Sequence, residues 1–405
     1  MTDTFTTGHG ADHPDQAAVA KLGDIAASAG LRRVHMLAWR DLADVEAGGS
    51  EIHAAAIAKL WAAAGIEVTM RTSYAQGHLP TEVRDGYKVV RRAGRYLIFP
   101  RAALAELRGA MGPRDGLVEI WNGMPFFSPL WAAGPRITFL HHVHAEMWQM
   151  ALPPNLAKVG DLIERRLAPP LYRRTRVVTL SESSKRELVE QLGFRPERVS
   201  VVHPGIDPRF SPGGTRSPRP LVVAVGRLVA VKRFHLLVDA LVALKPRHPD
   251  LRAVIVGDGY ERGALREQIA ANDADGWIAL AGRVDDAALI DLYRSAWVLA
   301  STSAREGWGM TLTEAAACGT PSVVTRIAGH EDAVDEGRSG LLAGDLPGIV
   351  AALDRVLGDA DLRRRLQEGA LAHARRFTWE ATARGTLEAL AEEAHRHARG
   401  RHRPG

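Results

Sequence analysis

Short apolar runs rich in β-branched residues alternate with helical patterns through most of this chain. Strands that alternate with helices in this way form parallel sheets that are covered on both faces. The pattern therefore predicts an α/β fold with two doubly wound units. The expected strands are Arg33–Ala38, Ile66–Met70, Lys88–Arg91, Val118–Trp121, Ile137–Leu140, Val177–Leu180 and Val199–Val202, followed by Leu221–Val225, Ala253–Val256, Ile278–Ala281, Val298–Ala300 and Ser322–Val324.

The length of 405 residues exceeds what one ordinary core accommodates, which also predicts two domains. We place the boundary near Gly205-Ile206-Asp207, before a segment rich in Pro and Gly that ends at Pro220. The expected domains are then residues 31–205 and 206–378, with a last helix at about 379–397. Residues 1–30 and 398–405 are expected to be disordered tails.

Composition restricts the class of protein. Apolar residues make up 46% and charged residues 24%, as in a soluble globular protein. No apolar run reaches the roughly 18 residues of a membrane span, and the N-terminus lacks the pattern of a signal peptide. The single cysteine, Cys318, excludes an internal disulfide and fits a reducing compartment. We therefore expect a cytoplasmic protein.

The net charge of +5 is modest, so the sequence gives little support to nucleic-acid binding. Basic and apolar residues nevertheless alternate around Pro169-Pro170, a pattern that suits contact with anionic lipid headgroups. A solvated helix face has the same appearance, so peripheral association with the inner face of a membrane and a solvated surface both stay open. The residues concerned are Leu162, Ile163, Arg165, Arg166, Leu167, Leu171, Tyr172, Arg173, Arg174 and Arg176.

The segment from Arg305 to Pro321 places Glu306 and Glu314 on either side of a glycine-bracketed turn that opens a helix. The first turn of a helix has unpaired N–H groups and the positive end of the helix dipole, which suit a phosphate, and carboxylates suit sugar hydroxyls. Acidic residues are also favoured at helix starts for dipole reasons alone. The whole segment indicates a nucleotide-sugar site.

Further candidates follow the expected strands. Arg227 and Lys232 come after Leu221–Val225, where fixed cations can stabilise a leaving diphosphate. Ligands of open α/β sheets bind at the carboxyl ends of strands, which makes Gly257, Asp258 and Val284 candidates for the ribose and base pocket.

In the first half, Gly48-Gly49-Ser50 joins a strand to a helix; Ser50 is the expected N-cap, and the glycines permit close approach of a ligand. Trp121 and Asn122 are the expected acceptor contacts, although a tryptophan at a strand end is more often part of the core. His141, His142 and His144 follow another strand. Zinc is disfavoured because the chain has one cysteine and no second histidine-rich segment, so no metal is predicted.

Residues 306–309, Glu-Gly-Trp-Gly, and 314–321, Glu-Ala-Ala-Ala-Cys-Gly-Thr-Pro, resemble the donor-binding signature of retaining glycosyltransferases of family four, which have the GT-B fold. The resemblance covers about residues 31–395 and implies two Rossmann-like domains that face each other across a cleft, with the last helix returning to the N-terminal domain. Pro204 stands where this family usually has Asn, and Arg233 replaces a small residue after the lysine.

The resemblance also implies roles for single residues. Glu306 would contact the transferred sugar and Glu314 the ribose, and Arg227 and Lys232 would hold the diphosphate in place of a metal. Gly49 would lie near the donor phosphates. His141 is the best positional match for a histidine beside the donor sugar, with His142 and His144 as alternatives and weak candidates for acceptor contacts. The amides expected to bind the diphosphate are those of Gly307, Trp308, Gly309, Met310 and Thr311.

The implied activity is transfer of a hexose from GDP-mannose or a UDP-sugar to an acceptor hydroxyl with retention of anomeric configuration, without a metal or cofactor. The acceptor class, whether lipid, saccharide or small metabolite, stays open. The Asp-x-Asp triplets at 273–275 and 359–361 resemble the metal motif of the other large glycosyltransferase fold, but we expect them to be surface residues. A phosphorylase would need a lysine segment for pyridoxal phosphate, which we do not find. A non-catalytic sugar-nucleotide-binding scaffold is the other alternative.

Overall fold

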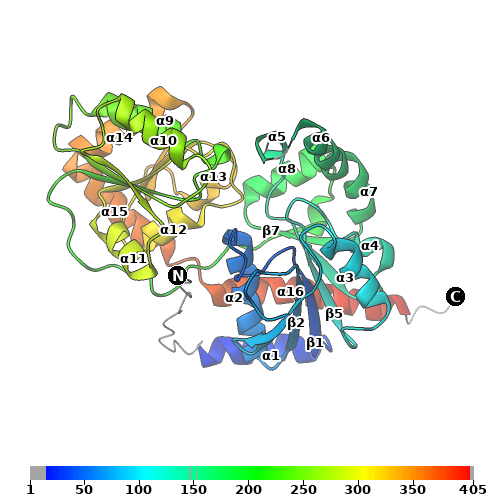
Figure 1. Cartoon of the computed structure of the whole chain (residues 1–405). Coiled ribbons are helices and arrows are strands. Elements are labelled where there is room, and N and C mark those ends of the chain that lie inside the picture. Colours follow the sequence, from blue (N-terminus) through cyan, green and yellow to red (C-terminus); the bar gives the residue numbers. More distant parts are fainter. Residues whose placement is uncertain (1–14, 146, 152, 402–405) are drawn as a thin grey trace. The chain divides into compact units, whose positions relative to one another are not determined.

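The computed structural model describes residues 15–145, 147–151 and 153–401 (Figure 1). By compactness the chain divides into two units. The first comprises the described parts of Met1–Ile120, Trp131–Ile137 and Glu380–Gly405, and the second comprises the described parts of Trp121–Leu130 and Thr138–Trp379.

Both ends of the described chain are more ordered than the sequence predicted. Helix α1 (Gln16–Ser28) occupies most of the described part of the expected N-terminal tail. Asp15 caps it by accepting a hydrogen bond from the amide of Ala17 at 3.0 Å, and Leu22 is buried. Helix α16 (Trp379–Arg401) extends past the predicted end at 397. Residues 1–14 and 402–405 of the two expected tails lie outside the described residues.

The larger sheet has eight strands in the order β3-β4-β2-β1-β5-β6-β7-β8. Its described pairings are parallel, except for β3 with β4, which form a hairpin around Asp85-Gly86, both with positive φ. The sequence analysis missed β3 because its four residues contain a single apolar one. The strands are β1 (Arg33–Leu37), β2 (Glu67–Thr72), β3 (Thr81–Arg84), β4 (Tyr87–Arg91), β5 (Gly116–Ile120), β6 (Arg136–Phe139), β7 (Arg176–Thr179) and β8 (Val199–Val201).

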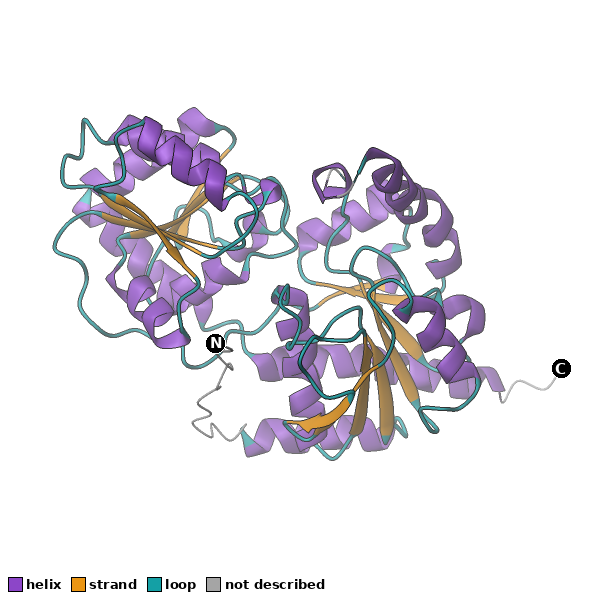
Figure 2. Cartoon of the chain, in the orientation of Figure 1, coloured by secondary structure: helices purple, strands orange, loops and turns teal. Residues whose placement is uncertain are grey.

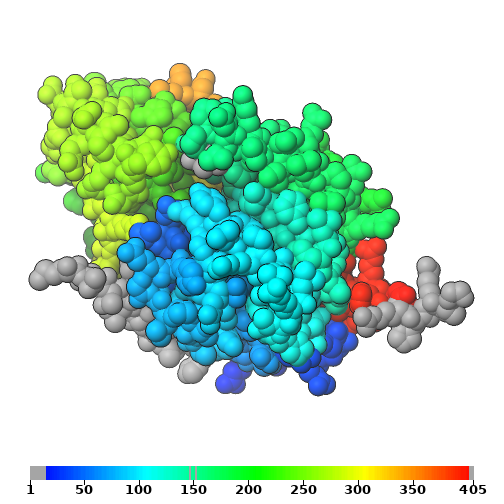
Figure 3. Space-filling view, turned by 45° about the vertical axis from the view of Figure 1, so that its right-hand side comes forward, coloured from blue at the N-terminus to red at the C-terminus, as the bar shows by residue number. Residues whose placement is uncertain are grey.

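In the first unit, α16 packs against residues from the start of the chain. The indole Nε1 of buried Trp61, in α2 (Gly49–Ala63), donates to the carbonyl of Ala383 at 3.0 Å. Gly116 in β5 lies close against α16, because a Cβ there would lie 3.0 Å from the side chain of Leu390. Helix α3 (Ile98–Leu107) also belongs to this unit. Figure 3 shows the surface formed by the blue and cyan segments of the unit. The short helix α4 is Ser128–Trp131.

The second unit contains a six-stranded parallel sheet in the order β11-β10-β9-β12-β13-β14. Helices cover both of its faces, as Figure 2 shows, which confirms the prediction of two Rossmann-like α/β sheets. The predicted strands agree with the observed ones to within a residue. The strands are β9 (Leu221–Val225), β10 (Arg252–Val256), β11 (Ile278–Gly282), β12 (Val298–Ser301), β13 (Ser322–Thr325) and β14 (Gly340–Ala343).

Two hydrophobic clusters lie on the two faces of this sheet. One joins the strands to α9 (Phe234–Leu244), α10 (Arg262–Ala271) and α14 (Leu346–Gly358). The other joins them to α11 (Asp286–Ser295), α12 (Met310–Ala317) and α15 (Ala360–Ala374). Strand β14 was missed because it is short and begins with Gly340, where a Cβ would lie 2.3 Å from the carbonyl oxygen of Ser322 in β13.

The predicted boundary at 205 and 206 lies inside the second unit, although the chain does change sheets between β8 and β9. Ion pairs and caps hold residues 138–205 to the later part of this unit. The Asp332 carboxylate accepts hydrogen bonds at 3.1 Å from the amides of Glu182 and Ser183, and Arg305 pairs with Glu187 at 2.7 Å. The remaining elements are α5 (Met147–Ala151), α6 (Pro154–Leu162), the π-helical η1 (Ile163–Leu167), α7 (Ala168–Tyr172), α8 (Glu182–Leu192), η2 (Pro196–Arg198), η3 (Ala230–Lys232) and α13 (His330–Ala333).

Candidate active site

The order of the six-stranded sheet reverses between β9 and β12, which are neighbours. Open α/β sheets bind ligands beyond the carboxyl ends of the strands at such a switch point. Lys232 follows β9 and Glu306 follows β12, and the structure joins the two side chains in an ion pair. Ser303 donates a second hydrogen bond to the same Glu306 oxygen at 2.8 Å. Residues that are far apart in the sequence thus meet where a ligand is expected.

The ion pair also determines the charge of Glu306. Burial acts to raise the pKa of this carboxyl group, but the positive charge of Lys232 and the hydrogen bonds from Lys232 and Ser303 hold the pKa below its ordinary value. Glu306 is therefore an anion at neutral pH, and it retains 17% side-chain exposure through which a ligand hydroxyl can reach it.

Arg233, noted above as a departure from the family pattern, fastens the two loops together. Its φ of 48° is left-handed, and its guanidinium donates to the carbonyls of Thr302 and Ser303, each at 2.8 Å. The hydroxyl of Thr302 donates back to the Arg233 carbonyl at 2.9 Å. Arg227, by contrast, is exposed, and its side chain has no partner within the described part of the chain. It is available for a ligand anion.

The carboxyl ends of β9, β10 and β11 approach one another through glycines. The Gly226 amide donates to the Val256 carbonyl, and the Gly257 amide donates to Gly282. Gly257 has a φ of 134°, and a Cβ there would lie 1.9 Å from the Gly226 oxygen, so only glycine fits. Asp258 is exposed beside it, and Val284 follows β11 at the same sheet edge. Their contacts with ribose or base remain predictions.

The turn before α12 has open amides. Gly309, with a φ of 98°, precedes the helix, and the N–H groups of Met310 and Thr311 in its first turn have no acceptor inside the helix. Gly329 packs on this turn so closely that a Cβ would lie 2.7 Å from the Glu306 carbonyl oxygen. The turn therefore presents donors and a positive dipole end to an anion.

The side chain of Trp308 is not part of this surface. It is 2% exposed and packs against His203 and Phe377, with ring centroids 4.8 and 5.1 Å away. The predicted donor contact of Trp308 concerns its main-chain amide and stays a prediction. The bulky residue lies between two glycines because its ring anchors the turn in the hydrophobic core.

His330 was missed by the sequence analysis. It is fully buried, its Nδ1 lies 2.9 Å from the Thr325 carbonyl, and its Nε2 has no hydrogen-bond partner among the residues described. Burial lowers its pKa to about 4, partly opposed by the negative charge of Glu306. It is therefore a neutral imidazole close to the carboxylate. The available signal was its position shortly after β13, where it begins the short helix α13.

Glu314 lies in α12, where the hydroxyl of Tyr293 donates to its Oε2 at 3.1 Å. Burial raises the pKa of Glu314 to about 7, and the charges of Asp207 and Asp286 act in the same direction. The group expected at the ribose thus changes charge near neutral pH.

The three histidines take different positions. His141 is buried, with its ring 6.1 Å from that of Phe139, and its carbonyl oxygen would lie 2.8 Å from a Cβ at Gly307. The His142 ring lies beside Gly307 instead, with Nδ1 3.2 Å from that Cβ position. Burial first, and then neighbouring positive charges including Arg305 and Lys232, lower the pKa of His142 well below its ordinary value. His142 is therefore neutral and faces the glycine turn.

Glu164 holds the histidine segment in place, and sequence reasoning missed it. This fully buried carboxylate accepts hydrogen bonds from the amides of His144 and Ala145 at 2.8 and 3.1 Å, and from the indole of Trp148 at 3.0 Å. It also lies 3.2 Å from the ring nitrogen Nδ1 of His144. Glu164 belongs to the π-helical turn η1, a form often found at functional sites. His144 is thus held in place by Glu164, with a side chain that is only 13% exposed.

The prediction of Trp121 as an acceptor contact is wrong. Its ring is 1% exposed and lies 5.0 Å from the ring of Tyr172, and its Nε1 donates to the Gly123 carbonyl at 2.9 Å. The ring is core, because the strand end turns inward there. Asn122 next to it is half-buried, and its contact with an acceptor remains a prediction.

The helix that follows the glycine loop of the first unit has a different N-cap residue from the one predicted. Gly48 is the N-cap of α2 in place of the predicted Ser50. The Glu51 carboxylate accepts from the Gly48 amide at 2.8 Å and pairs with Arg40, so it satisfies the helix start instead of a serine hydroxyl. Gly49 begins α2, and its contact with the donor remains a prediction.

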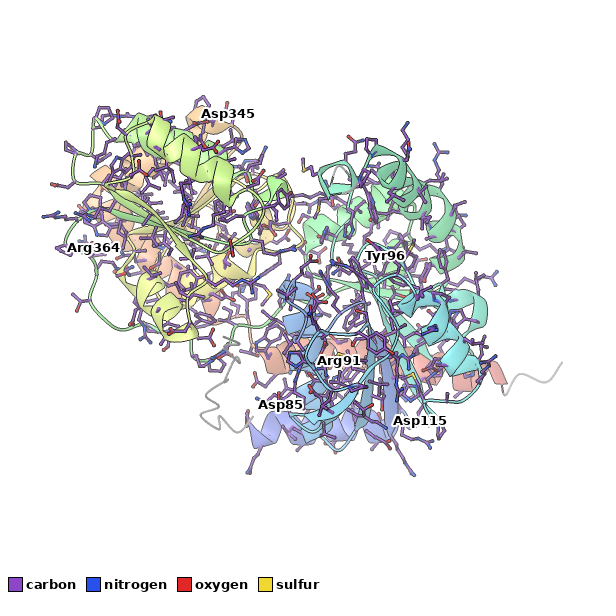
Figure 4. All side chains as sticks on the ribbon, in the orientation of Figure 1. Asp85, Arg91, Tyr96, Asp115, Asp345 and Arg364 are labelled. Atoms are coloured by element: carbon purple, nitrogen blue, oxygen red, sulfur yellow. The ribbon has the colours of Figure 1, made fainter. Side chains whose placement is uncertain are left out.

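The second Asp-x-Asp triplet is engaged in local contacts, and the first lies in a turn. Asp359 caps α15 through the Leu362 amide at 2.9 Å, and Asp361 pairs with Arg364, which Figure 4 labels. Asp273 lies in a turn after α10 with a φ of 52°. Over residues 15–145, 147–151 and 153–401, no group of three or more His, Cys, Asp or Glu side chains has an arrangement that could hold a metal ion.

Comparison with known proteins agrees with this arrangement. Residues 208–373 match the family described as "Glycosyl transferases group 1", and residues 47–210 match "Glycosyltransferase Family 4". A D-inositol 3-phosphate glycosyltransferase of Acidothermus cellulolyticus is 31% identical over 399 residues, which cover 86% of this chain and 87% of the relative. The enzyme of that name from Streptomyces bingchenggensis is 31% identical over 396 residues, covering 86% and 85%.

Solved structures show the same fold. Sucrose-phosphate synthase of Thermosynechococcus elongatus superposes with a TM-score of 0.75 at 19% identity, covering 88% of this chain and 97% of that one. Anabaena HepE, solved with UDP and glucose, gives a TM-score of 0.69 at 20% identity, covering 89% and 100%.

Two Rossmann-like sheets, with open helix amides, a cation and a carboxylate at a switch point, define a glycosyltransferase of the GT-B class. The chain belongs to the group 1 glycosyltransferases of family 4. It is accordingly an enzyme that transfers a hexose from a nucleotide-sugar donor.

The raised pKa of Glu314 leads to a testable dependence of stability on pH. The folded protein holds the proton up to about pH 7, whereas the carboxyl has an ordinary pKa of 4.5. The contribution of Glu314 to the free energy of unfolding is therefore complete below about pH 4.5 and is lost as the pH rises through about 7. Glu314→Gln removes the ionisation, so we expect its melting temperature to rise relative to wild type between about pH 5 and pH 8.

Glu190→Gln, at an exposed position in α8, is the matched control and should follow the wild-type curve. Parallel pH curves for wild type and Glu314→Gln would show that Glu314 is ionised throughout this range.

Proposed function

We propose that this enzyme transfers a hexose from a UDP-sugar with retention of anomeric configuration and without a metal ion. The observation that carries the proposal is the Lys232–Glu306 ion pair at the switch point, beside the open amides of α12. The choice of UDP over GDP is supported by Anabaena HepE, whose solved complexes contain UDP, UDP and glucose, or UDP-glucose.

In the proposed reaction, the amides of Met310 and Thr311, together with Arg227 and Lys232, hold the diphosphate. These fixed charges offset the negative charge that builds up as the glycosidic bond breaks, which is the task a metal performs elsewhere. The ionised Glu306 accepts hydrogen bonds from hydroxyls of the hexose, and Glu314 accepts from the ribose. The departing phosphate oxygen takes the proton of the acceptor hydroxyl on the same face of the sugar.

His142 is our candidate for the histidine beside the donor sugar, in place of His141. The support is its position: its ring lies against Gly307, next to the carboxylate-bearing turn, whereas His141 contributes a carbonyl there. A neutral imidazole donates or accepts a hydrogen bond without adding a charge that would oppose cleavage.

The acceptor that we propose is a hydroxyl of an inositol phosphate. The support is the name of the curated relatives, D-inositol 3-phosphate glycosyltransferases, which align with most of this chain.

A lipid acceptor is the second candidate, because the second unit exposes apolar side chains among basic ones. Leu156, Val159, Leu162 and Leu167 are each about half exposed, and Lys158 and Arg166 lie between them. Such a surface suits peripheral binding to anionic lipid. Arg176, assigned to this cluster from the sequence, instead lies in β7 and bonds to Ser200. No helix within the described ranges is long and apolar enough to cross a membrane.

Lys232→Met tests the donor site. Loss of a charge-assisted contact to the diphosphate should cost about 3 kcal/mol, on the order of a hundredfold in kcat. The measurement is UDP release with D-myo-inositol 3-phosphate as acceptor, with product identified by mass spectrometry. Lys21→Met, an exposed lysine of α1, is the control and should keep wild-type activity. Wild-type turnover in Lys232→Met would show that the donor site lies elsewhere.

The same assay should be unaffected by EDTA. Loss of activity that Mg²⁺ restores would refute metal-independent transfer.

The stereochemistry of the product tests retention directly. An α-linked UDP-hexose of gluco or galacto configuration should yield an α-glycoside, because no described carboxylate or base is assigned to the opposite face of the acceptor hydroxyl. NMR coupling at the anomeric proton of the first-formed product measures this. A β-glycoside would overturn both the mechanism and the role given to His142.

Vesicle sedimentation tests the membrane surface. The protein should sediment with vesicles of phosphatidylglycerol and phosphatidylcholine but not with phosphatidylcholine alone, since the basic residues need anionic headgroups. The double variant Leu156→Ser, Val159→Ser should lose this binding. Val83→Ser, an exposed valine of β3, should keep it. Equal sedimentation of all three proteins would remove the support for a lipid acceptor.

A further inference from the structure

A cavity of about 550 Å³ lies in the first unit, beside β2, β4 and α3. Its volume is in the range of small-molecule sites. The lining is strongly cationic and contains no Asp or Glu. The five positive side chains that line it are Arg71, Lys88, Arg92, Arg101 and Arg108.

The register of the two strands explains why the cations gather. Thr69 pairs with Lys88 and Arg71 with Val90, so alternate residues of β2 and β4 point to the same face of the sheet. This face carries Thr69, Arg71 and Lys88, and all three line the cavity. Arg101 in α3 and Arg108, which directly follows that helix, line it as well.

None of the five cations has an ion-pair or side-chain hydrogen-bond partner within residues 15–145, 147–151 and 153–401. Arg71 is 8% exposed, and its Nε is a buried donor without an acceptor. Burial and the charges of Arg92 and Arg101 together lower the pKa of Arg71. Glu106, a nearby carboxylate, is already engaged by His35 and Arg114, each at 2.7 Å.

The opposite face of β4 carries a buried arginine that does have acidic partners. Arg91, labelled in Figure 4, is fully buried and pairs with Asp41 at 2.5 Å and Glu82 at 2.8 Å. Arg71 has no such carboxylate partner, and its largely buried guanidinium is therefore less favourably placed than that of Arg91. An anion bound in the cavity would provide the missing partner.

We propose that this cavity binds a phosphorylated small molecule through its phosphate group. A phosphate matches the planar fork of arginine, accepts several hydrogen bonds at once and supplies the missing negative charge. The hydroxyl of Thr69 adds a neutral donor. All residues assigned to the sugar nucleotide except Gly49 lie in the second unit, so the inference does not rest on the proposed function.

Isothermal titration of the full-length protein tests the proposal, with glucose 6-phosphate and inorganic phosphate as probes and glucose as the uncharged control. Wild type should bind both phosphates at one competitive site and should not bind glucose. Arg71→Gln and Lys88→Gln should each weaken binding at least tenfold. Arg32→Gln, an exposed arginine of the same unit, should leave it unchanged.

Lys88 is exposed, so its variant keeps the test valid if Arg71→Gln fails to fold. Absence of phosphate binding, or equal affinity in wild type and both cavity variants, would overturn the inference. This measurement contains neither donor nor acceptor. The transferase assay can therefore fail while phosphate binding in the cavity is confirmed, and phosphate binding can fail while transfer is confirmed.

Discussion

The ion pair between Lys232 and Glu306 joins the two segments that leave the sheet at its switch point. Each residue follows a different strand, and 74 positions separate them in the sequence. Arg233, next to Lys232, adds two hydrogen bonds to the carbonyls that precede Glu306. The cation and the carboxylate are thus positioned before any ligand arrives, which would lower the reorganisation needed in the proposed reaction, where a diphosphate is a partner of Lys232.

Much of this arrangement could be predicted from the sequence, because buried parallel strands are continuous apolar runs. Every strand with such a run was found, whereas the polar β3 and the short β14 were not. The donor residues could be proposed from the sequence because glycines and carboxylates lie close together along the chain in one distinctive segment. Tail residues 16–28 were misjudged, although Val19, Leu22 and Ala26 recur at the spacing of one helix face.

Residues that act through long-range contacts could not be predicted. Glu164 is one carboxylate among arginines in the sequence, and only the folded chain shows that it is buried against the His144 amide. Trp121 illustrates the opposite error, because it was expected at the acceptor and its side chain fills the core. Sequence spacing locates a turn, but the direction of each side chain depends on how the turn packs.

The π-helical turn η1 connects two surfaces of different character. An α-helix rotates by about 100° per residue, and a π-turn holds one residue more than an α-turn. The extra residue sets the phase of Glu164, which faces inward, relative to Leu156 and Val159 of α6, which face outward. The number of residues between α6 and η1 is therefore constrained both by the buried carboxylate and by the exposed apolar side chains. A shortened or lengthened helix could not keep the carboxylate on the histidine segment and the apolar side chains at the surface, so this stretch tolerates substitutions more readily than insertions or deletions.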